Sequence, residues 1–268
     1  MKPRAHRAAV PVPVVVLVLM LVLGCTENRT HLSADAGAPA DIFECFPNLD
    51  GRIDAHELLA ATDLEATYLV GADRTVDLGG PPWDWSEDAG DEKQSFTAAR
   101  LTDQWYAPVF PDGEFVVPLD DDTDAIYAQD DAALWLLGIA SVAPDQTLLP
   151  YTEPVPVYPF PIEVGDSYAV VGNVAAGTLD RLPYVGADTY VIEVDAAGEM
   201  ILPHLRFTDA YRVRTTVTVA PAVGGVTVTR RQVSFLFECF GEVARATSRN
   251  DEPSEQFTLA AEIRRFSL

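Results

Sequence analysis

The chain is poor in basic residues, histidine and cysteine for its length of 268 residues. It holds 18 Lys+Arg against 41 Asp+Glu, which gives a formal net charge of -23. Proteins that bind phosphate backbones need a positive surface to displace counterions, so this charge argues against nucleic acid as a partner. Anionic membrane surfaces are disfavoured for the same reason. With 4 His and 3 Cys, the sequence also offers little material for histidine- or cysteine-based catalysis.

Known catalytic signatures are missing from the sequence. The G-x-S-x-G pattern of serine hydrolases fails at 165–169, where the second glycine is absent. The zinc-protease pattern H-E-x-x-H fails after His56-Glu57, because no second histidine follows at the required spacing. Paired carboxylates for glycoside cleavage stay open, since acidic residues are abundant.

A long apolar run occurs only near the amino terminus. Basic residues in the first seven positions precede an apolar, proline-containing run over 8–23, and Gly24-Cys25 follows. This three-part layout is typical of an export signal. Beyond residue 23 no stretch approaches the 18 apolar residues of a membrane-spanning helix, so the body is not predicted to be a membrane domain.

The end of that run, Val22-Leu23-Gly24-Cys25, resembles the lipobox of bacterial lipoproteins. The resemblance implies that residues 1–24 are a signal peptide, that Cys25 is acylated, and that a lipid anchor holds the protein at a membrane. Thr26 differs from the aspartate that usually retains such proteins at the inner membrane, so we expect the outer membrane of the cell envelope. An uncleaved anchor and a secreted soluble product are the alternatives.

With Cys25 acylated, two cysteines remain, Cys45 and Cys239, each within a Phe-Glu-Cys-Phe tetrapeptide. In an oxidising compartment we expect a disulfide that joins the start of the folded body to a strand near its end. Two independently buried thiols are the alternative. Residues 25–41 are small and polar without apolar periodicity, which predicts a flexible tether.

The segment after Cys45 resembles the later part of an EF-hand loop, the calcium-binding motif. Oxygen ligands at alternating positions would come from Asn48, Asp50, Arg52 through its carbonyl, Asp54 and Glu57. Phe46 at the first position offers no side-chain oxygen. The competing interpretation is a capping box, in which Asp54 and Glu57 start a short helix through Leu58 and Leu59. Calcium binding and a turn-helix structure are both kept as hypotheses.

From residue 67 onward, short alternating or apolar runs recur between turn signals, and helical periodicity is weak. The clearest pattern is a β-hairpin, with strands over 211–219 and 226–237. We therefore expect a mainly β fold, an antiparallel sandwich or strongly bent sheet with one short N-terminal helix. The β body is predicted over 42–268, and the proline-rich stretch 150–161 is either a division within it or an edge strand.

Alternation along the hairpin places Arg212 and Arg214 on one face, which we expect to be wet and to pair with carboxylates. Part of this region, from Asp188 through Leu202-Pro203 to Arg214, looks like a pattern of exported bacterial β proteins and lipoproteins. That resemblance is structural and implies no activity.

Trp83 and Trp85 follow a Gly-Gly-Pro-Pro turn and share one side of an extended segment. They are candidates for an aromatic platform that binds a sugar or peptide, with core packing as the alternative. Taken together, the sequence predicts a lipid-anchored envelope protein with a binding, scaffolding or surface-interaction role and a protein or glycan partner. An envelope hydrolase that uses acidic residues and a calcium-dependent binding module are the alternatives.

Overall fold

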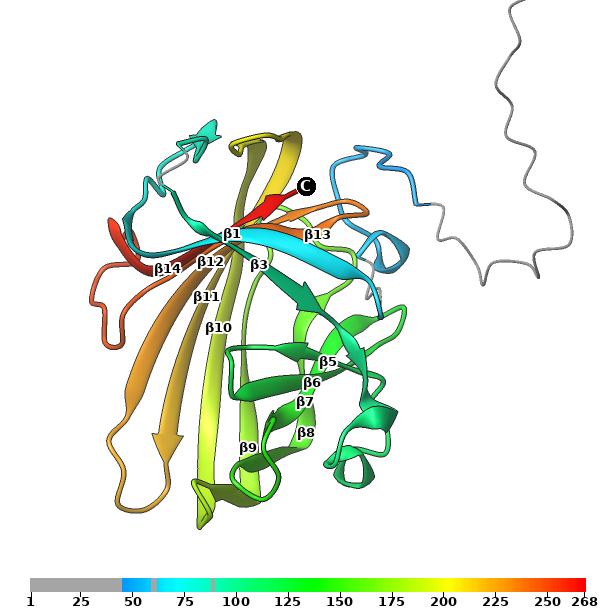
Figure 1. Cartoon of the computed structure of the whole chain (residues 1–268), viewed down its shortest axis with the longest axis vertical. Helices are drawn as coiled ribbons and strands as arrows, with labels where there is room; N and C mark the ends of the chain where they lie inside the picture. Colours follow the sequence, from blue (N-terminus) through cyan, green and yellow to red (C-terminus); the bar gives the residue numbers. More distant parts are fainter. Residues whose placement is uncertain (1–44, 59–61, 88–89) are drawn as a thin grey trace, which may run out of the picture. The chain divides into compact units, whose positions relative to one another are not determined.

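The computed structural model describes residues 45–58, 62–87 and 90–268. Over these ranges the chain builds one fourteen-stranded sheet, and all neighbouring strands are antiparallel except β2, which pairs in parallel with β10 (Figure 1). The strands are β1 (Glu65–Thr75), β2 (Trp83–Asp84), β3 (Glu92–Thr97), β4 (Ala99–Arg100), β5 (Phe115–Pro118), β6 (Thr123–Gln129), β7 (Ala133–Ser141), β8 (Leu148–Pro159), β9 (Ser167–Leu179), β10 (Leu182–Ile201), β11 (Arg206–Pro221), β12 (Val228–Phe237), β13 (Gly241–Thr247) and β14 (Leu259–Ser267).

The two ends of the sheet meet. Apart from β2, the strand order runs from β3 through β1 and β14 down to β5 and β4. A single residue, Ala98, separates β3 from β4, so the segment 92–100 pairs with β1 on one side and with β5 on the other. The sheet therefore closes almost completely into a barrel, which leaves few unpaired edges. The mainly β, strongly bent sheet is confirmed, and the sandwich is not what forms.

The hairpin expected from the sequence is confirmed as β11 and β12, which pair in register from Tyr211↔Leu236 to Val219↔Val228. Along β12, alternate residues face the two sides of the sheet, as the two-residue period of a strand requires. Val233, Phe235 and Phe237 belong to a core on the outer face, whereas Leu236 belongs to a core on the inner face.

Both faces of much of the sheet are covered. On the outside of β10 to β14, the segment 76–85 packs Val76, Leu78, Trp83 and Trp85 against Phe235 and its neighbours. On the outside of β5 to β7, the segment with the 3-10 turns η2 (Leu101–Asp103) and η3 (Ala107–Val109) covers Val116 and Ile126. Burial on two faces explains why these strands read as apolar runs as well as alternating ones.

The proline-rich stretch lies within this sheet. Most of residues 150–161 belong to β8, which pairs with β7 over 148–150 and again from 155 to 159, but shares only Leu148↔Thr178 with β9. Proline has no N–H to donate, so a regular ladder on both sides of β8 is not available. The Tyr168 hydroxyl donates to the Val157 carbonyl at 2.7 Å and links β9 to β8 instead. The residues from 45 onward group into one compact unit, which the stretch does not divide.

The short helix expected to run from Asp54 through Leu58 and Leu59 is not seen. In its place the described residues form a 3-10 turn, η1 (Ala55–Glu57), while Leu59 lies outside the described ranges. The Glu57 carbonyl accepts from the Cys239 backbone N–H at 2.7 Å. Because that carbonyl is used across the fold, it does not continue a helical ladder.

No helix among the described residues is long and apolar enough to cross a membrane.

Candidate functional site

The inside of the barrel holds a cavity of about 700 Å³. A barrel of more than eight strands is too wide for side chains alone to fill, so an internal space follows from the strand number. A cavity of this volume lies in the range of small-molecule binding sites, about 300 to 1,000 Å³.

The cavity walls are mostly apolar. They come from the inward-facing residues of strands on opposite sides of the barrel, chiefly β5 to β8 and β10 to β12. Burying an apolar chain against such walls stabilises a complex by roughly 25 cal/mol per Å² removed from water. The apolar lining includes Phe115, Leu134, Leu136, Ile139, Val157, Ile192, Val217 and Leu236.

The cavity is open to solvent. Several of its lining side chains are also exposed: Leu64 at 63%, Phe240 at 49% and Val219 at 36%. Exposed large apolar side chains next to an apolar cavity are characteristic of a ligand site more than of a sealed core.

A polar group of β13 lies on one part of the wall. Glu242 Oε1 is 2.8 Å from Arg245 Nε, and Ser234 Oγ donates to Glu242 Oε2 at 2.7 Å. The Tyr68 hydroxyl donates to the Glu242 backbone carbonyl at 2.7 Å. Glu242 is thus paired with Arg245 and hydrogen-bonded by Ser234, and charges in such a position need these partners because isolated charges lose too much solvation.

Two further tyrosines, Tyr127 of β6 and Tyr158 of β8, face the same space. Burial raises the pKa of Tyr127 to about 12, with Arg245 lowering and Glu242 raising it to smaller extents. Burial, and then the Glu242 charge, also raise the pKa of Tyr158. Both phenols therefore keep their protons at neutral pH and are hydrogen-bond donors.

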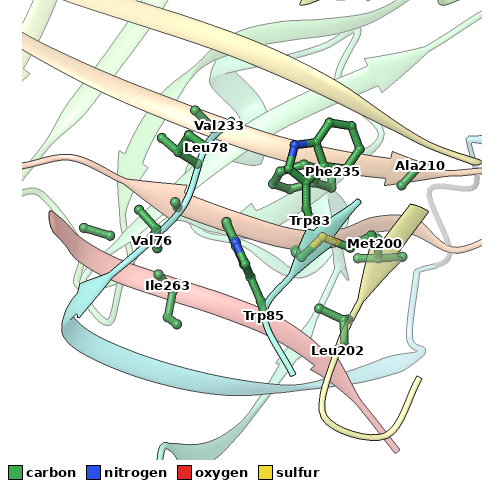
Figure 2. Packing of buried hydrophobic residues seen from close by; sticks show 14 of the residues in the cluster. Val76, Leu78, Trp83, Trp85, Met200, Leu202, Ala210, Val233, Phe235 and Ile263 are labelled. Carbon is green, nitrogen blue, oxygen red and sulfur yellow. The ribbon is translucent and has the colours of Figure 1, made fainter. Parts of the chain in front are cut away.

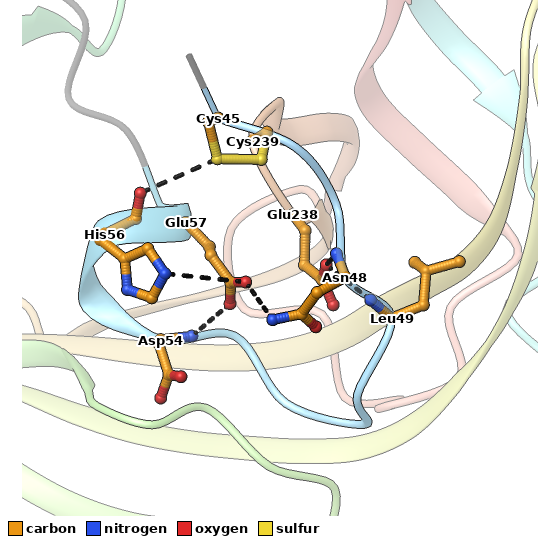
Figure 3. Close-up of a disulfide and its surroundings, with 8 residues drawn as sticks. All are labelled: Cys45, Asn48, Leu49, Asp54, His56, Glu57, Glu238 and Cys239. Carbon is orange, nitrogen blue, oxygen red and sulfur yellow. Dashed lines mark hydrogen bonds and ion pairs between the residues drawn. A yellow bond between two sulfur atoms is a disulfide. The ribbon is translucent and has the colours of Figure 1, made fainter. Parts of the chain in front are cut away.

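The disulfide expected between Cys45 and Cys239 is confirmed, with a Cα–Cα distance of 5.5 Å (Figure 3). Beside it, Glu238 Oε2 accepts the backbone N–H groups of Asn48 and Leu49 at 2.6 and 2.9 Å. Further along, Ile53 is fully buried and pairs with Ile162. The amino-terminal segment of the described body is thus fixed to the barrel at several points.

The residues of the EF-hand-like loop are hydrogen-bonded among themselves. Glu57 is 2% exposed; its Oε1 accepts from Asn48 Nδ2 at 2.7 Å and its Oε2 from the Asp54 N–H at 2.9 Å (Figure 3). Arg52 lies 3.7 Å from Asp50 and 3.3 Å from Asp54. The carboxylates are therefore engaged with protein donors, and among the described residues no group of three or more His, Cys, Asp or Glu side chains is placed to hold a metal.

Trp83 and Trp85 are buried in the outer core, at 2% and 6% exposure (Figure 2). Their rings lie 4.8 and 5.1 Å from the ring of Phe235, and Trp83 Nε1 donates to the Gly79 carbonyl at 2.7 Å. In this position the two indoles fill a core and present no face to a sugar or peptide.

The arginine face of the hairpin is paired but not wet. Asp195 accepts from Arg212 at 2.6 Å and from Arg214 at 2.7 Å, and Arg212 also donates to the Leu78 carbonyl at 2.7 Å. Arg212 is 6% exposed because the segment 76–85 covers it, and its guanidinium lies 5.1 Å from the Trp83 ring. Burial raises the pKa of Asp195, but the hydrogen bonds from the two arginines outweigh this and lower it.

Cys25, the expected lipid-attachment residue, and the tether 25–41 lie outside the described residues. So does the signal segment 1–24.

The cavity and its polar group were not predicted from the sequence. Glu242 and Arg245 are three residues apart, which in a regular strand places them on opposite faces. A register shift pairs Leu236 with Glu242 but Phe235 with Ala244, so Val243 is an extra residue in β13. This β-bulge brings both charged side chains to the inner face.

Comparison with protein-family models, with curated proteins and with solved structures gives no match.

Proposed function

We propose that this protein is a binding protein of the cell envelope that carries a small amphiphile with an apolar chain inside its barrel. The observation that supports the proposal is the open cavity of about 700 Å³, whose mostly apolar walls carry a few polar groups, the Glu242–Arg245 pair among them. Sites of this kind bind small molecules by burying the apolar part and orienting the polar part.

The proposal includes the location expected from the sequence, with the body tethered to the outer membrane through a lipid on Cys25. The net charge of -23 does not favour contact of the body itself with anionic lipid surfaces, so a covalent anchor would supply the membrane attachment. A binding protein anchored at the membrane would be close to apolar molecules when they dissociate from that membrane.

The cavity part is tested by displacement of a neutral fluorescent probe, N-phenyl-1-naphthylamine, from the purified mature body. Thr215→Trp/Val217→Trp fills the cavity, because both residues line it. Val191→Trp is the matched control: it adds the same ring to the outer face of the adjacent strand, where Val191 is 47% exposed and pairs with Thr216.

We expect the wild type and the Val191→Trp control to bind the probe alike and the cavity-filling variant to lose at least tenfold in affinity. Equal binding by all three proteins, with unchanged folding, would place the probe elsewhere and remove the basis of the proposal.

The location part is tested by Cys25→Ser. We expect this variant to leave the membrane fraction, and processing of the wild type to be blocked by globomycin. A Cys25→Ser protein that still sediments with membranes would refute the lipid tether without touching the cavity.

A further inference from the structure

The polar group on the cavity wall has hydrogen-bonding capacity that the protein does not use. In the part of the chain that the structure describes, the hydroxyls of Tyr127 and Tyr158 make no hydrogen bond to protein, although both residues line the cavity. Tyr127 and Tyr158 line the same cavity as Glu242 and Arg245, and these two charges shift the pKa of both phenols. Four polar side chains from three strands therefore line the same cavity.

The Arg245 guanidinium has N–H donors that no protein group in the described ranges uses. Its Nε lies beside Glu242, and its terminal nitrogens have no acceptor among the residues described. The side chain is 19% exposed, and because Arg245 lines the cavity, that exposed part faces the internal space. A guanidinium presents its N–H groups as a planar fork that matches the two oxygens of a carboxylate.

The unused groups of Arg245, Tyr127 and Tyr158 can all donate, while Gln129, whose Oε1 has no partner among the described residues, adds an acceptor to the cavity lining. Because the raised pKa values keep both phenols protonated, the tyrosines would donate to a ligand oxygen, as would the terminal guanidinium nitrogens. The acceptor on this wall, Glu242, is already engaged by Ser234 and Arg245. A ligand placed against Arg245, Tyr127 and Tyr158 must therefore bring acceptors, and the strongest acceptor for a guanidinium and two phenols is an anion.

Resting on the proposed function, we infer that the ligand of the cavity is a long-chain carboxylic acid, with its carboxylate bound by Arg245, Tyr127 and Tyr158 and its chain along the apolar walls. The Arg245–Glu242 pair keeps the wall neutral while the cavity is empty. The incoming carboxylate takes the terminal nitrogens and leaves the Nε contact with Glu242 in place.

The inference is tested with three probes of equal chain length: dodecanoate, 1-dodecanol and dodecylamine, each measured by displacement of N-phenyl-1-naphthylamine. The main variant is Glu242→Gln/Arg245→Met, which replaces the ion pair by neutral side chains of similar size and so leaves no unpaired charge. Tyr127→Phe/Tyr158→Phe removes the two hydroxyls alone. Arg230→Met is the matched control, because Arg230 also lines the cavity but is exposed to solvent, with its Nε 3.3 Å from Asn250 Oδ1.

We expect the wild type to bind dodecanoate at least tenfold more tightly than dodecanol. The pair-replacing variant should lose this tenfold preference while it still binds dodecanol, the tyrosine variant should lose about threefold, and Arg230→Met should keep the preference. A further variant, Glu242→Gln alone, should bind dodecanoate more tightly, because it removes the competing negative charge.

Equal affinity of the wild type for dodecanoate and dodecanol, or a preference for dodecylamine, would overturn the head-group inference and leave the cavity proposal intact. An Arg230→Met variant that loses the preference as fully as the Arg245 variant would also overturn it, since general charge would then explain the result. Failure of all three probes to displace the fluorophore, together with fluorophore binding unaffected by Thr215→Trp/Val217→Trp, would reject the proposed function itself.

Discussion

Removal of the disulfide is expected to have the largest single effect on the stability of the barrel body. Cys45→Ser/Cys239→Ser opens a covalent loop between residues 194 positions apart. The loop-closure relation gives about 5 kcal/mol for a loop of this length, because the cross-link restricts the unfolded chain. Since a folded domain is stable by only about 5 to 15 kcal/mol, such a loss would be a large fraction of the total.

The native fold should nevertheless survive in the variant. Without the cross-link, the segment from 45 to 58 is still held by the two N–H groups that donate to Glu238, by the Cys239 N–H that donates to the Glu57 carbonyl, and by the Ile53–Ile162 pair. We therefore expect unchanged β-sheet circular dichroism in the absence of urea and a much lower midpoint of unfolding.

The assay is urea unfolding followed by tryptophan fluorescence, for the wild type and the double variant, each with and without dithiothreitol. Reduction should lower the free energy of unfolding of the wild type to that of the variant and leave the variant unchanged. The slope with urea should rise on reduction, because the unfolded chain becomes more expanded. A loss below about 1 kcal/mol, or a variant that still responds to dithiothreitol, would refute this reasoning.

Three further predictions concern the cores and the amino-terminal loop. Phe235 is fully buried and contacts Trp83 and Trp85. Phe235→Ala should therefore lower the free energy of unfolding by about 3 to 5 kcal/mol in urea titrations. A loss under about 1 kcal/mol would show that the outer core is not packed as described. Burial raises the pKa of Asp188, and the hydrogen bond from Tyr151 lowers it to a smaller extent. The pKa of Asp188 is therefore higher in the folded protein than in the unfolded chain. The protonated carboxyl favours the fold at low pH, and this contribution to stability is lost as the pH rises through the folded-state pKa. Asp188→Asn should accordingly gain stability relative to the wild type between pH 3 and pH 7, whereas a pH-independent difference would contradict the assignment. Millimolar calcium or EDTA should leave the melting temperature unchanged, because Glu57 is engaged with Asn48 and Asp54, and a rise with calcium that Glu57→Gln abolishes would instead support calcium binding by this loop.

Local chemistry along the chain was sufficient to predict the β11–β12 hairpin and the Cys45–Cys239 disulfide. The hairpin is encoded by alternation on each side of a glycine-containing turn, so its register depends on residues close in sequence. The disulfide was inferred from the export signal and the number of remaining cysteines, and it needed no knowledge of the intervening fold.

Barrel closure was not predictable in the same way. It depends on Ala98, where one short segment changes its partner from β1 to β5, and on the pairing of β1 with β14 from the other end of the described body. Period-two alternation states which residues share a face, but it does not state whether that face packs on a second layer or surrounds a space.

The polar group of the cavity and the tryptophans were missed for related reasons. A bulge at Val243 reverses the face expected for Arg245 relative to Glu242, and bulges carry no strong local signal. Trp83 and Trp85 were placed on one side of an extended segment, as observed, but the sheet that buries that side is formed by strands more than a hundred residues later. Their alternative interpretation as core residues is the one that the structure describes.

The most direct test of the internal binding site is photo-crosslinking with a diazirine-bearing long-chain fatty acid, followed by peptide mapping of the labelled residues. We expect labels on inward-facing residues of β6 to β8 and β11 to β13, with the strongest loss of labelling in Thr215→Trp/Val217→Trp. Labels concentrated on the outer face, at exposed residues such as Val171 and Val191, would contradict it.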